Sequence, residues 1–245
     1  MQDILRTLTP ADFGFLIGVI GGSKERRLTA LLDAVQDDDP VEARAALTDT
    51  LEHEIRYYGS ADVPYMARKA FGAEPGVSFS VIIHDAARKL RVRLTPFSTE
   101  REMIAELAQE TATQQFASLT SDEQQRLLED LGIERERAVA FLKRSAGVFA
   151  VPTMIEAFGI IVVQGLVKTV IFGLIAKIVG AQLAARLFQF LVSRLPWWVG
   201  WISPAAWTLS LGWVALDIQG PAMRKTIPVV LYLGLCVLRE EGESL

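Results

Sequence analysis

One uncharged segment near the C-terminus constrains this chain of 245 residues more than any other feature. Residues 195–216 contain no Asp, Glu, Lys or Arg, and all 5 tryptophans of the chain lie among them. These 22 residues slightly exceed the roughly 20 that a helix needs to cross the hydrocarbon core of a bilayer. The segment must therefore be buried in lipid, in a partner or in the protein's own core.

The apolar region extends beyond this segment and divides the chain by composition. Residues 148–238 contain only eight charged side chains. Residues 1–145 have 24 acidic and 18 basic side chains, a net charge of −6, whereas residues 146–245 have 5 and 7, a net charge of +2. The overall acidity argues against nucleic-acid binding, which requires a clustered basic face.

The first 145 residues have the pattern of short, capped helices. Thr9 is expected to cap a helix that begins at Pro10, and Thr99 with Glu102 has the spacing of a capping box. Thr120 with Glu123 repeats that spacing, and a further helix is predicted over 134–149. Because no alternating strand pattern occurs, we predict an all-α fold.

Three segments are predicted within this all-α chain. They are an N-terminal helical module over 1–39, an acidic helical domain over 40–145, and an apolar hairpin or bundle of helices over 146–240, which either contacts a membrane or forms a core. The run of acidic residues before Pro40 separates the first two, and the change in composition separates the second from the third. We expect residues 1–145 alone to be soluble and helical.

The apolar helices admit two interpretations. Small residues at Gly180, Ala181, Ala184 and Ala185 allow close helix packing, either in lipid or in protein. Tryptophan favours the headgroup level of a bilayer, where its ring is buried and its N–H stays hydrated. We therefore expect membrane contact, in a kinked or re-entrant hairpin, by Trp197, Trp198, Trp201 and Trp207. The alternative is a buried helical core in which each indole N–H finds a protein partner.

Four cations near the end of a helix expected over 76–94 also have two explanations. They are Arg88, Lys89, Arg91 and Arg93. Cations at a helix C-terminus are favoured by the helix dipole. The same side chains would also form a patch suited to anionic lipid headgroups.

No residue pattern indicates catalysis, a metal or a cofactor. His53 has no second histidine four residues away, and His84 and Asp85 point about 100° apart on a helix. The stretch ending in Ser23-Lys24 lacks the glycine that a phosphate loop has before its lysine. Cys236, the single cysteine, lies in an apolar run and is expected to be a small buried side chain. We expect a non-enzymatic protein.

A short C-terminal motif resembles the YaaW-like family of bacterial proteins. Its residues are Asp217-Ile218, Gly220-Pro221-Ala222, Arg224 and Thr226-Ile227-Pro228, followed by an apolar helix and Arg239. The order of the preceding helices is similar over about 40–240. The family is loosely grouped with ubiquinol–cytochrome c chaperones, so the resemblance implies a helical protein that assists assembly of a membrane complex, and it brings no functional residues with it. The tryptophan-containing stretch departs from relatives, which are rich in glycine and alanine there.

The motif also has a structural explanation of its own. Asp217, Gly220, Pro221, Arg224, Thr226 and Pro228 form this structural signature. Pro221 is expected to kink or restart a helix, and an Asp217–Arg224 ion pair would close that kink in the core or at a membrane surface.

Two hypotheses for function follow. In the first, a membrane-associated helical protein acts as an assembly factor or a membrane-perturbing effector, peripheral to or inserted in the inner membrane from the cytoplasm. Its partner is then membrane lipid or a membrane protein. In the second, a soluble helical protein-binding module uses the apolar half as its own core or as a groove for a partner. Self-association is compatible with both. The first residues lack the pattern of a secretory signal, which favours the cytoplasm.

Overall fold

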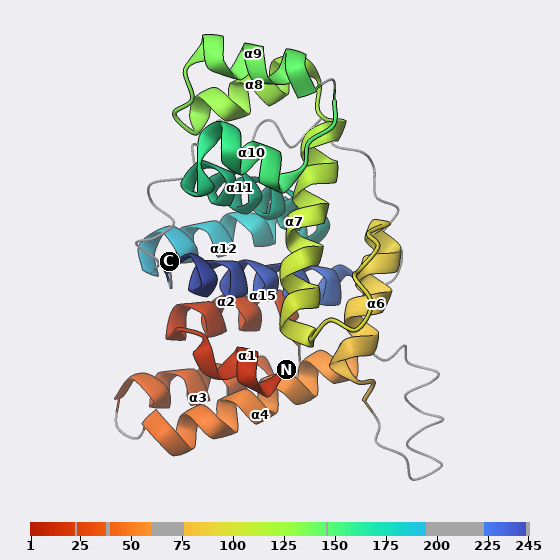
Figure 1. Ribbon diagram of the computed structural model, residues 1–245. Helices are drawn as coiled ribbons and strands as arrows, with labels where there is room; N and C mark the ends of the chain where they lie inside the picture. The colour runs from red at the N-terminus through yellow and green to blue at the C-terminus, as the bar shows by residue number, and fades with distance from the viewer. Residues whose placement is uncertain (23, 38–39, 60–75, 146, 195–222, 244–245) are drawn as a thin grey trace.

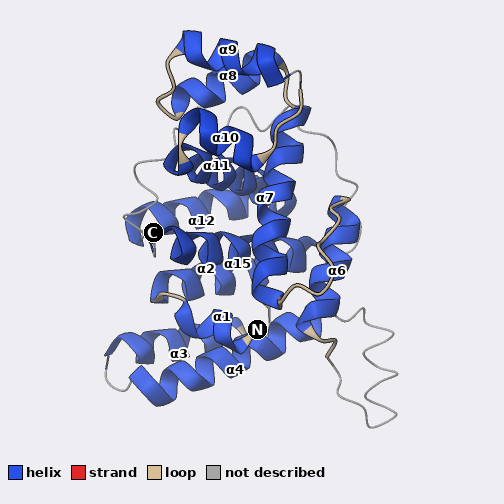
Figure 2. Cartoon of the chain, in the orientation of Figure 1, coloured by secondary structure: helices blue, strands red, loops and turns tan. Residues whose placement is uncertain are grey.

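A computed structural model gives the fold of residues 1–245 except 23, 38–39, 60–75, 146, 195–222 and 244–245. Every regular element in these described ranges is a helix, which confirms the predicted all-α fold (Figure 2). The helices are α1 (Gln2–Thr7), α2 (Pro10–Ile20), α3 (Glu25–Asp37), α4 (Pro40–Gly59), α6 (Phe79–Leu90), α7 (Glu100–Ser118), α8 (Ser121–Asp130), α9 (Arg135–Ser145), α10 (Val151–Phe158), α11 (Ile160–Val179), α12 (Ala181–Arg194) and α15 (Met223–Glu243).

Local sequence signals begin several of these helices at the predicted positions. Thr99 and Glu102 form a capping box at the start of α7, and Thr120 and Glu123 form one at the start of α8. Thr9 caps α2 with Pro10 in the first turn, as predicted. Each box satisfies backbone N–H groups that have no partner within the helix.

Helix α15 lies at the centre of the molecule. It contacts α2, α4, α6, α7 and α11, and Figure 1 shows it crossing the middle of the structure between α2 and α12. Every residue from 226 to 237 is buried. A helix that is apolar on all sides is stable in water only when other elements surround it, and that is the position α15 occupies.

Gly234 permits the close crossing of α15 and α7. A Cβ atom at this position would overlap the carbonyl oxygen of Ile104 and approach the Cβ of Ala108 to 2.9 Å, and both residues belong to α7. Any larger residue would therefore push the two central helices apart.

The acidic and apolar parts of the sequence share one core. Buried side chains from Ile4 to Val237 form a single apolar cluster, to which α2, α4, α6, α7, α11 and α15 all contribute. The boundary predicted between 145 and 146 thus separates segments that pack against each other.

Two helices are shorter than the sequence predicts. The helix expected over 134–149 ends at Ser145, and Gly147 follows with φ +83°, a conformation that favours glycine. The helix expected over 76–94 is α6, which ends at Leu90 because Arg91 takes a left-handed conformation with φ 60°.

Single glycines join the helices before and after α11. Gly159 (φ 86°, ψ 158°) connects α10 to α11, and Gly180 (φ 88°, ψ 156°) connects α11 to α12. This region of backbone conformation is essentially restricted to glycine. It lets the chain change direction between consecutive apolar helices within one residue.

Candidate functional site

The strongest concentration of buried polar groups lies where α2 meets α15. Asp12 is the third residue of α2, and its carboxylate accepts hydrogen bonds from the backbone N–H and the hydroxyl of Thr9, at 2.8 and 2.7 Å. The side chain of Asp12 is 0% exposed. The capping box therefore fixes a carboxylate inside the protein, where it requires cationic or hydrogen-bonding partners.

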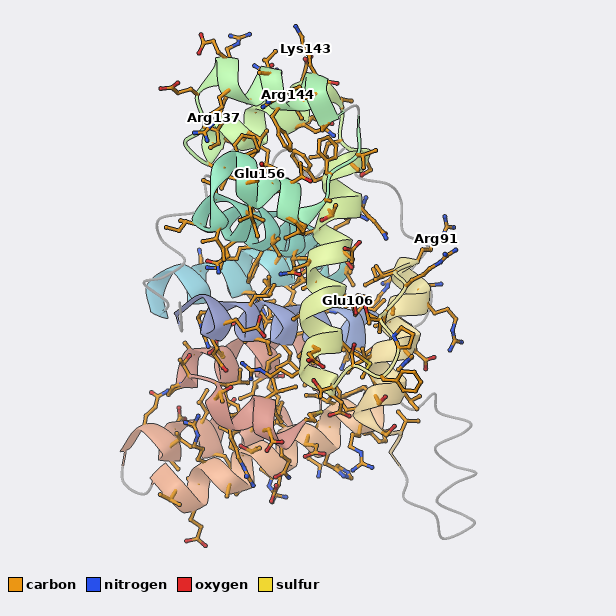
Figure 3. The ribbon with its side chains drawn as sticks, viewed as in Figure 1. Arg91, Glu106, Arg137, Lys143, Arg144 and Glu156 are labelled. Atoms are coloured by element: carbon orange, nitrogen blue, oxygen red, sulfur yellow. The ribbon has the colours of Figure 1, made fainter. Side chains whose placement is uncertain are left out.

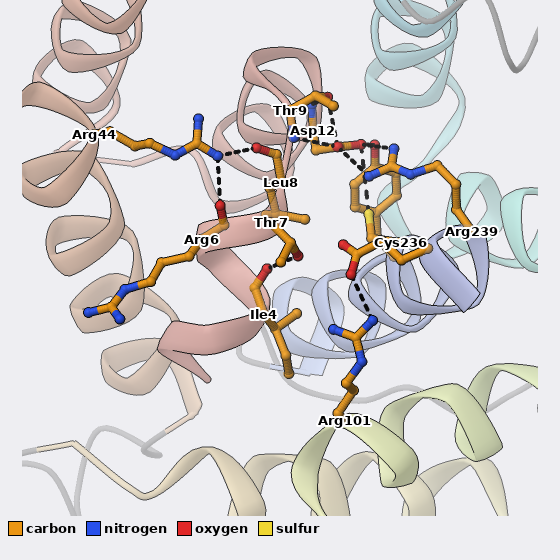
Figure 4. A network of polar contacts seen from close by, with 12 residues as sticks. Ile4, Arg6, Thr7, Leu8, Thr9, Asp12, Arg44, Arg101, Cys236 and Arg239 are labelled. Carbon is orange, nitrogen blue, oxygen red and sulfur yellow. Dashed lines mark hydrogen bonds and ion pairs between the residues drawn. The ribbon is translucent and has the colours of Figure 1, made fainter. Parts of the chain in front are cut away.

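Three residues of α15 supply those partners. Tyr232, Cys236 and Arg239 follow one another at intervals of four and three residues, which places them on one face of the helix. The Tyr232 hydroxyl donates to Asp12 Oδ1 at 2.7 Å, and the Cys236 thiol lies 3.7 Å from the same oxygen. Arg239 donates from Nη1 to Oδ1 at 3.2 Å and from Nη2 to Oδ2 at 3.0 Å. We call these four residues the Asp12 cluster (Figure 4).

The Asp12 cluster is an ion pair with neutral donors around it. Burial by itself raises the pKa of Asp12, but hydrogen bonds and charge from Arg239, with the contacts from Thr9, outweigh burial and lower it. Burial by itself lowers the pKa of Arg239, and the hydrogen bonds and charge of Asp12 reverse that effect and raise it. Both groups are therefore ionised at neutral pH.

The tyrosine and the cysteine stay protonated. Burial raises the pKa of Tyr232 well above its ordinary value, and the negative charge of Asp12 raises it further. Burial, followed by the charge of Asp12, likewise raises the pKa of the Cys236 thiol. Because the thiolate is the nucleophilic form of cysteine, this arrangement suppresses the reactivity of Cys236.

Further ion pairs tie α7 to both ends of the chain. The N-terminal amine of Met1 lies 2.6 Å from Glu100 Oε2, and Arg101 lies 2.7 Å from Glu240. Glu240 is next to Arg239 on α15, so the Asp12 cluster and the contacts of α7 meet at the same end of this helix (Figure 4). The arrangement holds α2, α7 and α15 in one register, and the Asp12 cluster is buried from solvent.

Most residues predicted as membrane contacts or signature positions lie outside the described residues. These are Trp197, Trp198, Trp201, Trp207, Asp217, Gly220 and Pro221, and the proposed Asp217–Arg224 pair lies there with them. The remaining signature residues begin α15: Arg224 is exposed, Thr226 is buried and Pro228 lies within the helix.

Helix α11 is apolar enough to be compared with a membrane span. Among the described helices it is the one whose length and composition would allow a crossing, with 20 residues and a mean hydropathy of 1.9. However, 61% of its most apolar window is buried inside the protein. Core helices of soluble proteins have the same properties, so these properties do not distinguish lipid from protein as its surroundings.

The two histidines do not lie in a common site. His53 is exposed on α4, and His84 is exposed on α6 with its Nδ1 2.7 Å from the carbonyl oxygen of Ser80. Within the described part of the chain, no group of three or more His, Cys, Asp or Glu side chains is placed to hold a metal ion.

The sequence predicts the helix that contains Asp12 and the burial of Cys236, but not the contact between these two residues. The available signal was the spacing of Tyr232, Cys236 and Arg239 within an otherwise apolar helix, which marks a polar stripe that needs a partner. Nothing local to α15 indicates that this partner lies in α2.

Comparison with known proteins finds a relative that covers most of this chain. No protein-family model matches it, and no solved structure matches it. A UPF0174 protein of Helicobacter pylori (strain J99 / ATCC 700824) is 26% identical over 239 residues, which cover 93% of this chain and 85% of that protein. The chain is thus similar, over most of its length, to a protein from an uncharacterised bacterial family.

Proposed function

We propose that this protein is a non-enzymatic, membrane-associated helical protein whose attachment depends on residues 195–216. The proposal rests on the burial of the other apolar segments inside the protein. Residues 226–237 of α15 are buried throughout, and α11 is largely buried, so both serve the protein's own core. The uncharged segment with all five tryptophans is then the apolar part of the sequence best suited to lipid.

The charges around this segment support the same proposal. Arg186 and Arg194 precede it, and Arg224 and Lys225 follow it. Arginine and lysine side chains at the ends of an apolar segment can reach the phosphate level of a bilayer while their aliphatic parts stay in apolar surroundings. The described Arg224 is exposed, as this role requires.

The role that fits such a protein is binding rather than catalysis. A helical body held at the cytoplasmic side of a membrane would act as an assembly factor for a membrane protein, in keeping with the YaaW-like resemblance and its chaperone grouping, or as a membrane-perturbing effector. Its partners would be membrane lipid or a membrane protein.

A soluble helical protein-binding module is the second candidate. It is favoured by the burial of α11, because a helix that passes the composition test for a membrane span here serves mainly as core. Under this alternative, residues 195–216 would be buried in protein as well.

Tryptophan fluorescence separates the two candidates. The emission reports on residues 195–216 alone, because every tryptophan lies there. Adding phosphatidylglycerol vesicles to the full chain should shift the emission to the blue, and the shift should be largely insensitive to salt, since apolar burial drives it. Emission that is already blue in buffer and does not respond to vesicles would select the soluble module.

Two variants localise the contact. Replacing Trp197, Trp198 and Trp201 together by alanine should weaken vesicle binding more than replacing Trp213, which serves as the matched control. Fractionation of the native protein followed by a carbonate wash gives an independent result. Recovery entirely in the soluble fraction without detergent would refute membrane association.

A further inference from the structure

A groove lies between α9 and α10. The inference drawn from it rests on the proposed membrane role and extends that role to the binding of lipid headgroups. The volume of the groove is about 490 Å³, and the groove is lined by Arg137, Phe141, Arg144, Ser145, Thr153, Glu156 and Ala157. Figure 3 shows Arg137, Arg144 and Glu156 together at the end of the molecule formed by α8, α9 and α10. The volume lies within the range of small-ligand sites, about 300–1,000 Å³.

Helical spacing explains why these side chains share one groove. Arg137, Phe141 and Arg144 recur at intervals of four and three residues, so they lie along one face of α9. Thr153, Glu156 and Ala157 form the corresponding face of α10. The Phe141 ring is buried, and its centroid lies 4.6 Å from that of the Phe158 ring. This contact joins α9 to α10 beside the groove.

The two arginines are in different situations. Arg137 crosses the groove, donates a hydrogen bond to the carbonyl oxygen of Ala157 and lies over the Phe158 ring at 5.8 Å. Arg144 is exposed, and no ion pair within 4.0 Å joins it to another side chain among the residues that the structure describes. Arg144 is therefore the cation of the groove that has donors to offer a ligand.

We propose that the Arg144 end of this groove binds a phosphate group. A guanidinium presents several N–H donors in a planar fork that matches phosphate oxygens. Thr153 adds a hydroxyl from the opposite wall, in the first turn of α10, where the helix dipole favours an anion. No side chain caps this end of α10, so the N–H groups of its first turn, other than at Pro152, which has none, add to the positive potential there.

Exposed aliphatic side chains beside the groove favour a lipid headgroup over a free phosphate as the source. Val148 is 74% exposed, and its N–H donates to the carbonyl oxygen of Ser145 at 2.8 Å, which places it directly beside the Arg144 end. Ile161, just beyond the other end of α10, is 61% exposed. Aliphatic side chains next to a phosphate site can enter the acyl region of a bilayer when a headgroup occupies the groove.

Glu156 should weaken phosphate binding in this groove, so its removal should have the opposite effect to removal of Arg144. Its carboxylate lines the same groove and opposes an anion by repulsion. Glu156→Gln should therefore strengthen phosphate binding about threefold, whereas Arg144→Gln should weaken it about tenfold, as expected for loss of a charge-assisted hydrogen bond. Lys143→Gln is the matched control, because Lys143 is an exposed cation next to Arg144 that does not line the groove.

The test measures binding of the full chain to phosphatidylglycerol vesicles for the native protein and these three variants, with glycerol 3-phosphate as a soluble competitor. The proposal expects opposite effects of Arg144→Gln and Glu156→Gln, no more than a twofold effect of Lys143→Gln, and competition that is lost in Arg144→Gln. Equal effects of Arg144→Gln and Lys143→Gln would show that general surface charge, rather than the groove, attracts the vesicles, and would overturn the proposal.

A failure of the proposed function is distinguishable from a failure of this site. If the native protein does not bind vesicles at all, glycerol 3-phosphate is titrated into the isotope-labelled protein and amide shifts are followed. Saturable shifts at Val148 and Thr153 that disappear in Arg144→Gln would support the site with a free phosphate as its ligand. The absence of such shifts would overturn it.

Discussion

The guanidinium of Arg239 faces the carboxylate of Asp12 through two hydrogen bonds, although 227 residues of sequence separate them. The pair joins the first turn of α2 to the last turns of the central helix α15. Tyr232 and Cys236 complete the surroundings of the carboxylate, so the charge of Asp12 is compensated on every side that the structure describes.

Removing one partner of this ion pair should destabilise the protein strongly. Asp12→Asn leaves Arg239 as an uncompensated buried charge, which typically costs about 3–5 kcal/mol of the free energy of unfolding. Urea unfolding followed by circular dichroism measures the loss. Asp3→Asn, on the exposed face of α1, is the control and should change stability by less than about 0.5 kcal/mol.

Removing both charges should be less harmful than removing one. The double variant Asp12→Asn/Arg239→Met eliminates the unpaired cation and keeps an apolar side chain of similar length, so it should regain about half or more of the lost stability. A double variant less stable than Asp12→Asn alone would show that Arg239 contributes mainly through contacts other than those with Asp12.

The Asp12 cluster should also make stability depend on pH in the acid range. The pKa of Asp12 is lower in the folded protein than in the unfolded chain, where it is about 3.9. Its contribution is therefore fully present above the unfolded pKa and is lost as the pH falls below that value towards the folded pKa. Urea midpoints measured between pH 7 and pH 2.5 should show a smaller acid decrease in the double variant than in the native protein.

Gly159 and Gly180, the single-residue junctions on either side of α11, should not tolerate replacement by another residue. Gly180→Ala introduces no clash, because no atom lies within 4 Å of the new Cβ, but it forces alanine to φ 88° and ψ 156°. We expect a loss of about 1–3 kcal/mol in stability from the backbone conformation. Gln182→Ala, two residues further on at an exposed position of α12, should be nearly neutral. If Gly180→Ala matched this control, the junction would have to adopt another conformation.

Truncation tests whether the acidic part folds by itself. The sequence predicts that residues 1–145 alone are soluble and helical, whereas the shared core leads to the opposite expectation. Without α15 and α11, apolar residues of α2 and α7 such as Phe15 and Ile104 would be exposed. The fragment should therefore aggregate or bind a hydrophobic dye. A monomeric, cooperatively unfolding fragment would instead establish an independent domain that ends near residue 145.

Local signals in the sequence were sufficient to predict that the chain forms helices and to predict where several of them begin. A capping box such as Thr99–Glu102 involves residues three positions apart, so its outcome depends on the backbone of a single turn. The end of α6 at Leu90 was not predicted, because the left-handed conformation that closes it falls on Arg91, and such a conformation is uncommon for any residue except glycine.

The sequence by itself determined that the chain is helical and that Cys236 lies among apolar residues, in a region with few charges. Only the tertiary structure decided what surrounds α15 and which carboxylate meets Arg239. Helical periodicity and caps arise from interactions over a few residues, so they can be recognised in a sequence. The pairing of Asp12 with Arg239 depends on how α2 packs across α15, and that packing results from the shapes of many side chains acting together.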